Sequence, residues 1–123
     1  MFFKKKKRFG KIPTKAEREL ARKIITDKVD YFCSKYGFSY NRISIRNQTT
    51  RLGSCSTLKN LNFNWQIIKF PEDKMEYIIK HELAHLKHPN HGRSFWNEVY
   101  SMDPNYKNNH KWTKEHARKY LKF

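Results

Sequence analysis

The sequence predicts an α+β fold. Apolar residues recur at helical spacing near the start of the chain and through its second half, whereas between residues 39 and 68 they alternate with polar residues. A run of strands flanked by helices is typical of α+β domains, whose helices cover a small sheet. The 123 residues are enough for one core but not for two independent ones. We therefore expect a flexible basic arm over residues 1–12 and a single domain over residues 13–123.

The first predicted helix begins after Pro13. Thr14 is a suitable N-cap, and Glu17 follows three residues later, which is the spacing of a capping box. The apolar residues that follow recur at helical spacing: Ala21, Ile24, Ile25, Val29, Phe32, Cys33 and Tyr36. Gly37 is a natural stop, because glycine readily adopts the left-handed backbone that ends many helices. The pattern predicts one long helix that covers the core.

The middle of the chain predicts strands. Isoleucines and large apolar residues alternate with polar ones in two stretches: Ile43 and Ile45, then Leu61, Phe63 and Trp65. A further strand is expected over about residues 52–57, with a turn at residues 59–60 before the next strand. Gly53 lies inside this segment and predicts a bulge or a close backbone approach.

Helices are expected again from Pro71 onward. Glu72 and Asp73 place negative charge in the first turn, where the helix dipole favours it. The packing residues of this helix share helical spacing: Met75, Ile78, Ile79, Leu83 and Leu86. Another helix follows and is ended by Pro104, and a last helix begins at about Asn109.

The predicted second helix carries an HExxH motif. His81 and His85 are four residues apart, so a helix presents both imidazoles on one face, as a zinc ion requires. Glu82 lies beside the first histidine, close enough to hold a metal-bound water without being a ligand. Pro89 ends the helix and allows the chain to turn back, so His91 is a plausible third ligand.

His88 is an alternative third ligand. It would share the face of His85 only if the helix continued, and the following proline indicates that the helix ends there. Three protein ligands leave a fourth tetrahedral position for water, which is the catalytic rather than the structural arrangement. The motif therefore predicts one Zn²⁺ per chain.

The chain is strongly basic. It has 27 Lys and Arg residues against 11 Asp and Glu residues, a formal net charge of +16. Such a charge attracts polyanions, so nucleic acid is a candidate partner through the basic surface. The basic residues are scattered along almost the whole chain, which a well-solvated surface explains equally well. The sequence leaves both interpretations open.

The cysteines and the hydropathy pattern bear on location. Cys33 and Cys55 are 22 positions apart and form no CxxC motif, so we expect two reduced thiols. The N-terminal charges are not followed by the apolar run of a secretory signal, and no segment approaches the ~20 apolar residues of a membrane span. We expect a cytoplasmic monomer with no membrane partner.

Several segments in the same order resemble the YgjP-type metallopeptidase domain, which is related to the WLM and SprT-like zincins. They are RLGSCS (51–56), LNFNW (61–65), the HExxH region (81–91) with FW (95–96), and PNY (104–106). The resemblance runs from about residue 40 to 112. It implies a zincin-like fold, in which a small antiparallel sheet of about three strands packs against the long N-terminal helix and the HExxH helix, with C-terminal helices. It also implies His81, His85 and His91 as metal ligands and Glu82 as the catalytic acid and base.

The ligand set predicts a zinc metallopeptidase of the endopeptidase type acting on a peptide or protein substrate. Zinc would lower the pKa of its water to about 7, and Glu82 would take the water's proton and pass it to the leaving amine. If the strand of Asn62 and Asn64 is an edge beside the metal, its backbone can pair with a peptide. The substrate-binding candidates are Arg51, Asn62, Asn64, Arg93 and Tyr106. His88 joins Arg51, Arg93 and Tyr106 as a candidate donor to the oxyanion.

A second function remains open: a basic nucleic-acid-binding module whose zinc is structural. Glu82 distinguishes the two functions, because a structural site usually closes with four protein ligands and has no use for a carboxylate beside an open position.

Overall fold

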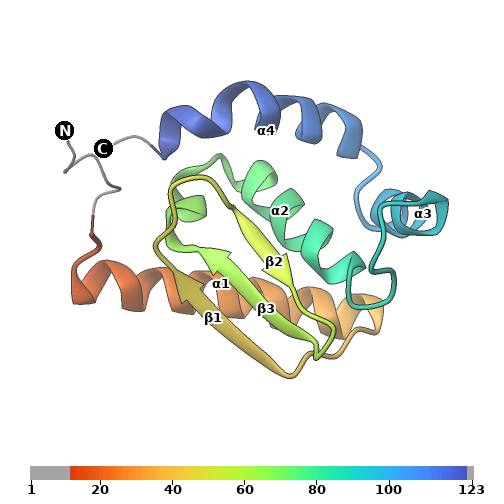
Figure 1. Cartoon of the computed structure of the whole chain (residues 1–123), viewed down its shortest axis with the longest axis horizontal. Coiled ribbons are helices and arrows are strands. Elements are labelled where there is room, and N and C mark those ends of the chain that lie inside the picture. The colour runs from red at the N-terminus through yellow and green to blue at the C-terminus, as the bar shows by residue number, and fades with distance from the viewer. Residues whose placement is uncertain (1–11, 122–123) are drawn as a thin grey trace.

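A computed structural model of the chain describes residues 12–121 (Figure 1). Its elements are α1 (Lys15–Tyr36), β1 (Arg42–Arg46), β2 (Gly53–Cys55), β3 (Asn60–Asn64), a 3-10 helix η1 (Trp65–Lys69), α2 (Glu72–Ala84), α3 (Arg93–Met102) and α4 (Tyr106–Tyr120). The predicted α+β class is confirmed. Residues 1–11 of the predicted basic arm lie outside the described residues.

Helix α1 begins and ends as its sequence predicts. The Thr14 hydroxyl accepts from the Glu17 N–H at 3.0 Å, and the Glu17 carboxylate accepts from the Thr14 N–H at 2.9 Å. These two bonds satisfy backbone donors that a helix start leaves free. Gly37 has φ 77°, in the left-handed region, and its N–H donates to the Cys33 carbonyl. The predicted capping box and stop are therefore both present.

The sheet is mixed, which corrects the expectation of an antiparallel sheet. Its strand order is β1-β3-β2, with β1 parallel to β3 and β2 antiparallel to β3. The short turn after β2 folds the chain directly back and makes that pair antiparallel. The connection before β2 instead carries the chain across to the far side of the position that β3 takes (Figure 1). Alternation of apolar residues identifies the buried face but not the strands that pair.

The strand of Asn62 and Asn64 is β3, and it lies in the centre of the sheet rather than at an edge. Both sides of its backbone pair with other strands, so the expectation that it could bind an extended peptide is wrong. The edge strands are β1 and β2, and β2 is shorter than predicted. Trp65, expected to continue the alternation of β3, begins η1 instead.

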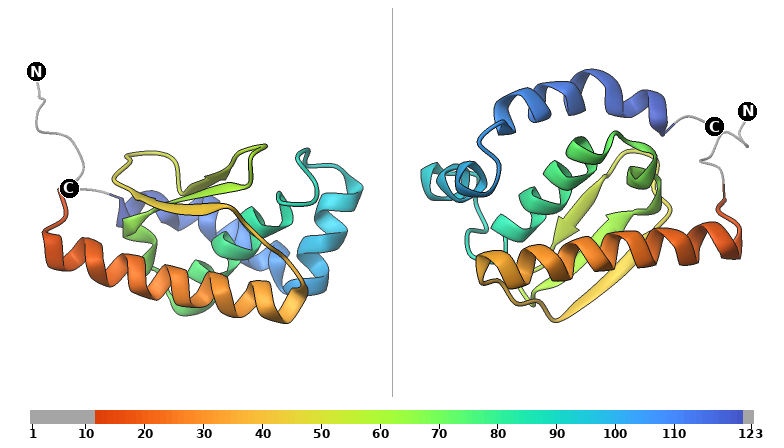
Figure 2. Two further views of the ribbon diagram at one scale, coloured as in Figure 1. Left: turned by 90° about the horizontal axis from the view of Figure 1, so that it is seen from below. Right: turned by 180° about the vertical axis from the view of Figure 1, so that it is seen from behind.

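The helices lie on one side of the sheet, and Figure 2 shows the other face free of helices. The core between the layers is formed by fully buried apolar side chains: Ala21, Ile25 and Val29 of α1, Leu61 and Phe63 of β3, and Ile79 and Leu83 of α2. Because α2 runs beneath β2, its last turns lie at that edge of the sheet (Figure 1).

Helix α4 begins at Tyr106, three residues before the predicted start. Asn109, which is buried, explains how α4 docks on α2. Its amide nitrogen donates to the Asp103 carboxylate at 2.9 Å, and its amide oxygen accepts from the Lys74 ammonium at 2.7 Å. Helix propensity does not account for these tertiary hydrogen bonds, which stabilise the polar first turn of α4.

No helix within residues 12–121 is long and apolar enough to cross a membrane. The two cysteines carry free thiols, as expected. The cytoplasmic location and the monomeric state stay predictions.

Candidate metal centre

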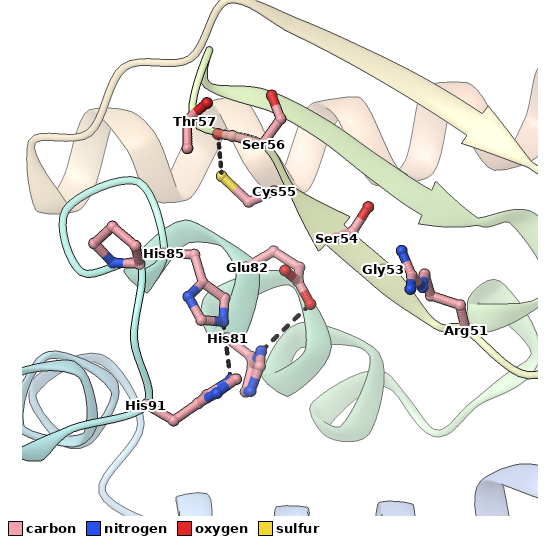
Figure 3. A pocket seen from close by; sticks show the side chains of 11 residues that line it. Arg51, Gly53, Ser54, Cys55, Ser56, Thr57, His81, Glu82, His85 and His91 are labelled. Carbon is pink, nitrogen blue, oxygen red and sulfur yellow. Dashed lines mark hydrogen bonds and ion pairs between the residues drawn. The ribbon is translucent and has the colours of Figure 1, made fainter.

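The predicted metal ligands meet at the C-terminal end of α2. His81 lies in the last turn of the helix, and His85 is the residue that caps it. His91 follows in the loop that leads to α3. One ring nitrogen from each of the three histidines lies within 4.8 Å of the others. The helical spacing of His81 and His85 and the turn at Pro89 therefore bring together the three nitrogens predicted from the sequence (Figure 3).

The separation of the nitrogens fits a single ion. The Nε2 atoms of His85 and His91 are 3.0 Å apart. Two nitrogens bound tetrahedrally to one zinc at 2.0–2.1 Å would be about 3.3 Å apart. This pair therefore fits a divalent metal with a movement of only a few tenths of an ångström, and the third nitrogen lies within 4.8 Å of both.

The His85 ring is oriented by the backbone that follows it. Its Nδ1 donates to the His88 carbonyl at 3.0 Å, which leaves Nε2 free to bind a metal. The His88 ring points elsewhere and contacts the Glu98 carboxylate at 3.3 Å. His88, the alternative third ligand, is not in the three-histidine group.

Aromatic side chains of α3 support the three imidazoles. The fully buried Phe95 ring lies 5.0, 4.4 and 4.8 Å from the rings of His81, His85 and His91. Trp96 lies 6.0 Å from His81 and 6.2 Å from His91. Because a close-packed ring restricts the movement of its neighbours, Phe95 holds the histidines near the geometry that a metal requires.

Glu82 is buried beside the histidines. It is 6% exposed, and its Oε2 lies 3.3 Å from Nδ1 of His81. A Cβ placed on Gly53 would lie 3.1 Å from Cγ of Glu82 and 3.1 Å from the Asn62 carbonyl oxygen. The close approach predicted at Gly53 is therefore present, and it involves the carboxylate side chain of the motif.

The environment perturbs two groups of the site. Partial withdrawal from water, reinforced by His85 and His81, lowers the pKa of His91. A lowered pKa favours the neutral imidazole, which is the form that binds metals. Burial, reinforced by Glu82, raises the pKa of the Cys55 thiol to about 11. The thiol thus stays protonated at neutral pH, and Cys55 is outside the three-histidine group.

A pocket of about 400 Å³ opens over this cluster. Strand β2 and the turn after it form one wall, and α2 with the loop before α3 forms the other (Figure 3). The lining residues are Arg51, Gly53, Ser54, Cys55, Ser56, Thr57, His81, Glu82, His85, Pro89 and His91. The metal ligands and the buried carboxylate thus face an accessible cleft.

The backbone of β2 also faces this pocket. Leu52 and Ser56, on either side of the strand, bond to β3 through the Asn64 N–H and the Asn60 carbonyl. Because bonding alternates along an antiparallel pair, the N–H and carbonyl groups of Gly53 and Cys55 point toward the free edge. They are available to pair with an extended chain.

Of the predicted substrate-binding residues, Arg51 lines the pocket. Asn62 does not: its amide donates to the Ser54 hydroxyl at 3.2 Å and its oxygen accepts from Arg46 at 3.3 Å. Asn64 is fully buried, and its amide donates to the carbonyls of Gln48 and Arg51. Asn64 therefore holds the loop over residues 47–52 in place from within the fold.

Arg93 and Tyr106 also lie outside the pocket lining. Arg93 is the exposed first residue of α3. The Tyr106 ring stacks on Trp96 with centroids 5.4 Å apart, and Trp96 in turn contacts His81 and His91. The structure does not bring these two residues together with Arg51.

Sequence reasoning missed a supporting layer behind His81. Tyr77, one turn earlier on α2, packs its ring 6.0 Å from that of His81, and its hydroxyl shares a 2.8 Å hydrogen bond with Nδ1 of His110 on α4. Burial raises the pKa of Tyr77, so its hydroxyl stays protonated. The spacing of four between Tyr77 and His81 could have identified Tyr77 as a neighbour of His81 on the same helical face, but no pattern in the sequence identifies His110. The pocket wall over residues 54–57 was also missed.

This combination of a mixed sheet, a helix carrying an HExxH motif and a third histidine in the following loop defines a zincin-like metallopeptidase domain. Comparison with known proteins agrees with this class. The chain belongs to the YgjP-like metallopeptidase domain family, whose model matches residues 4–116. No curated protein matches the sequence significantly.

Solved structures show the same fold. The metallopeptidase zymogen abylysin from Pyrococcus abyssi is 25% identical with a TM-score of 0.66, and the match covers 76% of this chain and 96% of abylysin. The metallopeptidase zymogen jannalysin from Methanocaldococcus jannaschii is 28% identical with a TM-score of 0.62, and the match covers 74% of this chain and 94% of jannalysin.

Proposed function

We propose that the protein is a zinc-dependent metallopeptidase that hydrolyses peptide bonds. The observation that carries this proposal is the donor set: three histidine nitrogens within 4.8 Å of one another, with no Cys, Asp or Glu of residues 12–121 joining them. Such a set leaves a coordination position for water, as in catalytic zinc sites. Family membership supports a protein or peptide as the substrate.

His81, His85 and His91 would hold one zinc per chain, which when bound supplies Lewis acidity to a water and to the scissile carbonyl. Glu82 takes a proton from the attacking water and delivers it to the leaving amine. Its carboxylate is suited to this role because it is buried beside His81 but is not a member of the ligand group. Arg51, which lines the pocket, is the donor best placed to act on the developing oxyanion.

The substrate would bind as an extended segment along β2. The outward backbone groups of Gly53 and Cys55 provide the hydrogen bonds of an added strand. The substrate backbone would then lie in the pocket between β2 and the three histidines, which Glu82 also lines.

The alternative, a nucleic-acid-binding module with a structural zinc, fits the site less well. A structural zinc site normally has four protein ligands. The nearest thiol, Cys55, is outside the histidine group and stays protonated.

The test uses Glu82→Gln, which keeps the shape of the side chain but cannot accept the proton. Purified wild type should contain one zinc per chain and cleave sites in a peptide library. The variant should keep its zinc and its unfolding temperature but lose activity by about 10⁴-fold, because a positioned general base contributes about 10²- to 10⁴-fold and Glu82 also orients the water. Equal cleavage by a zinc-loaded variant would disprove the mechanism. Purified wild type without bound metal would disprove the assignment of a metal site to the three histidines.

A further inference from the structure

We infer that the outer face of α4 is a binding surface for the phosphate backbone of a nucleic acid. Four cationic residues recur along it at intervals of three or four: Lys107, Lys111, Lys114 and Arg118. All four are exposed, and the opposite face of α4 is buried through Asn109 and Ala117. At 1.5 Å per residue the row extends about 16 Å. We call these four residues the α4 cationic row.

The α4 cationic row is not neutralised within the described part of the chain. None of its members forms an ion pair with another residue from 12 to 121. Helix α4 has five Lys and Arg residues against one Glu, whereas α1 has six against four Asp and Glu. The excess charge is therefore higher on the shorter helix, and four of its five cations lie on one face. The scattered pattern of the sequence becomes a linear array once the chain folds.

A groove adjoins the C-terminal half of the row. Lys114 and Arg118 contribute cations from α4, and Thr49 and Thr50 contribute hydroxyls from the loop before β2. The rest of the lining is Thr113 and three apolar side chains: Leu52, Ala117 and Leu121. The groove holds about 190 Å³. The hydroxyls of Thr49 and Thr50 form no hydrogen bond to any residue that the structure describes, so they are free to donate to a phosphate oxygen. Two cations facing two free hydroxyls suit a phosphate group better than a carboxylate on a flexible side chain.

The surface lacks the anchors of a protein interface. Exposed large apolar side chains in residues 12–121 are Ile12, Leu20, Tyr31, Leu58 and Tyr100, and none belongs to α4. Protein interfaces depend on buried aromatic and apolar residues at their centres, whereas nonspecific nucleic-acid binding depends on cations spaced along a backbone. Binding should therefore be insensitive to base sequence.

The α4 cationic row also has a defined position relative to the metal centre. Helix α4 lies at the periphery of the fold, with no other described element on its outer side (Figures 1 and 2). The loop over residues 47–52 contributes Thr49 and Thr50 to the groove and Arg51 to the metal pocket, and Gly53 of the same pocket follows the loop. A nucleic acid on α4 would thus lie beside the pocket, and proteins attached to it would be held near the pocket.

The test compares two full-length variants with the same loss of charge. The first replaces the α4 cationic row: Lys107→Gln, Lys111→Gln, Lys114→Gln and Arg118→Gln. The control replaces four exposed cations of α1: Lys15→Gln, Arg22→Gln, Lys23→Gln and Lys35→Gln. The affinity for a labelled mixed-sequence DNA duplex is measured as a function of salt, and thermal unfolding confirms that both variants are folded.

We expect the α4 variant to lose about fivefold in affinity per contact at 0.15 M salt, hence several-hundredfold in all, and the slope of log K against log salt to fall by about three to four. The control should remain within about tenfold of wild type, since its cations lie among carboxylates. Unchanged binding by the α4 variant would overturn the inference, and so would an equal loss in the control, which would assign the affinity to net charge alone. Competition by polyglutamate as strong as by DNA would assign the surface to acidic proteins. The assay requires no hydrolysis, so its outcome does not depend on the proposed peptidase activity.

Discussion

The contact between Gly53 and Glu82 predicts what a single methyl group would do. In Gly53→Ala the new Cβ would lie within 3.1–3.3 Å of three groups: Cγ of Glu82, the Asn62 carbonyl oxygen and Cδ1 of Phe63. The carbonyl belongs to the central strand and Phe63 is fully buried, so the Glu82 side chain and β2 must move. Overpacking costs about 1–3 kcal/mol; we expect about 2 kcal/mol, which lowers Tm by roughly 6–12 °C for a chain of this size.

The same displacement should reduce peptidase activity about tenfold, because small misplacements of a catalytic group are costly. The assay combines thermal unfolding with hydrolysis by protein of equal zinc content. Gly92→Ala is a matched control, since a Cβ there meets nothing within 4 Å, and φ is −88°. Its loss should be about 1 kcal/mol or less, as expected for alanine at an N-cap, with activity retained. If Gly53→Ala matched wild type in both Tm and activity, β2 would not be packed against Glu82 as described.

Two further predictions concern the residues around the metal ligands. His91→Ala should abolish stoichiometric zinc binding, whereas His88→Ala should retain it, because the His88 ring contacts Glu98 rather than the three-histidine group. Metal analysis of both variants tests this prediction, and the reverse result would make His88 the third ligand in place of His91. Tyr77→Phe removes the 2.8 Å hydrogen bond to His110 and should lower the free energy of unfolding by about 1 kcal/mol. Denaturant unfolding measures this loss, and an unchanged stability would mean that the bond contributes nothing.

The sequence predicted features that local interactions determine. The capping residues of α1 and the left-handed Gly37 act within a few positions of the chain, so their pattern is readable directly. The ligands His81 and His85 were predictable for the same reason, because helical spacing alone places them together.

Features that depend on distant contacts were not predictable in the same way. The parallel pairing of β1 with β3 depends on the path of the loop between β1 and β2, and alternation carries no information about that path. Asn62 and Asn64, which were expected at the substrate site, instead bond to Arg46 and Ser54 of the neighbouring strands and to the loop over residues 47–52, and residue type alone does not reveal these partners. The hydrogen bond between Tyr77 and His110 joins residues 33 positions apart, and neither residue belongs to a recognisable motif.

The position of His91 has a thermodynamic consequence. His81 lies in α2 and His85 caps it, whereas His91 is separated from α3 by Gly92 alone. A metal held by all three would therefore cross-link the end of one helix to the beginning of the next. Its binding free energy would include the cost of ordering the intervening loop. Linkage is reciprocal, so any ligand that shifts α3 relative to α2 must change metal affinity, and metal occupancy must change the affinity for that ligand by the same factor.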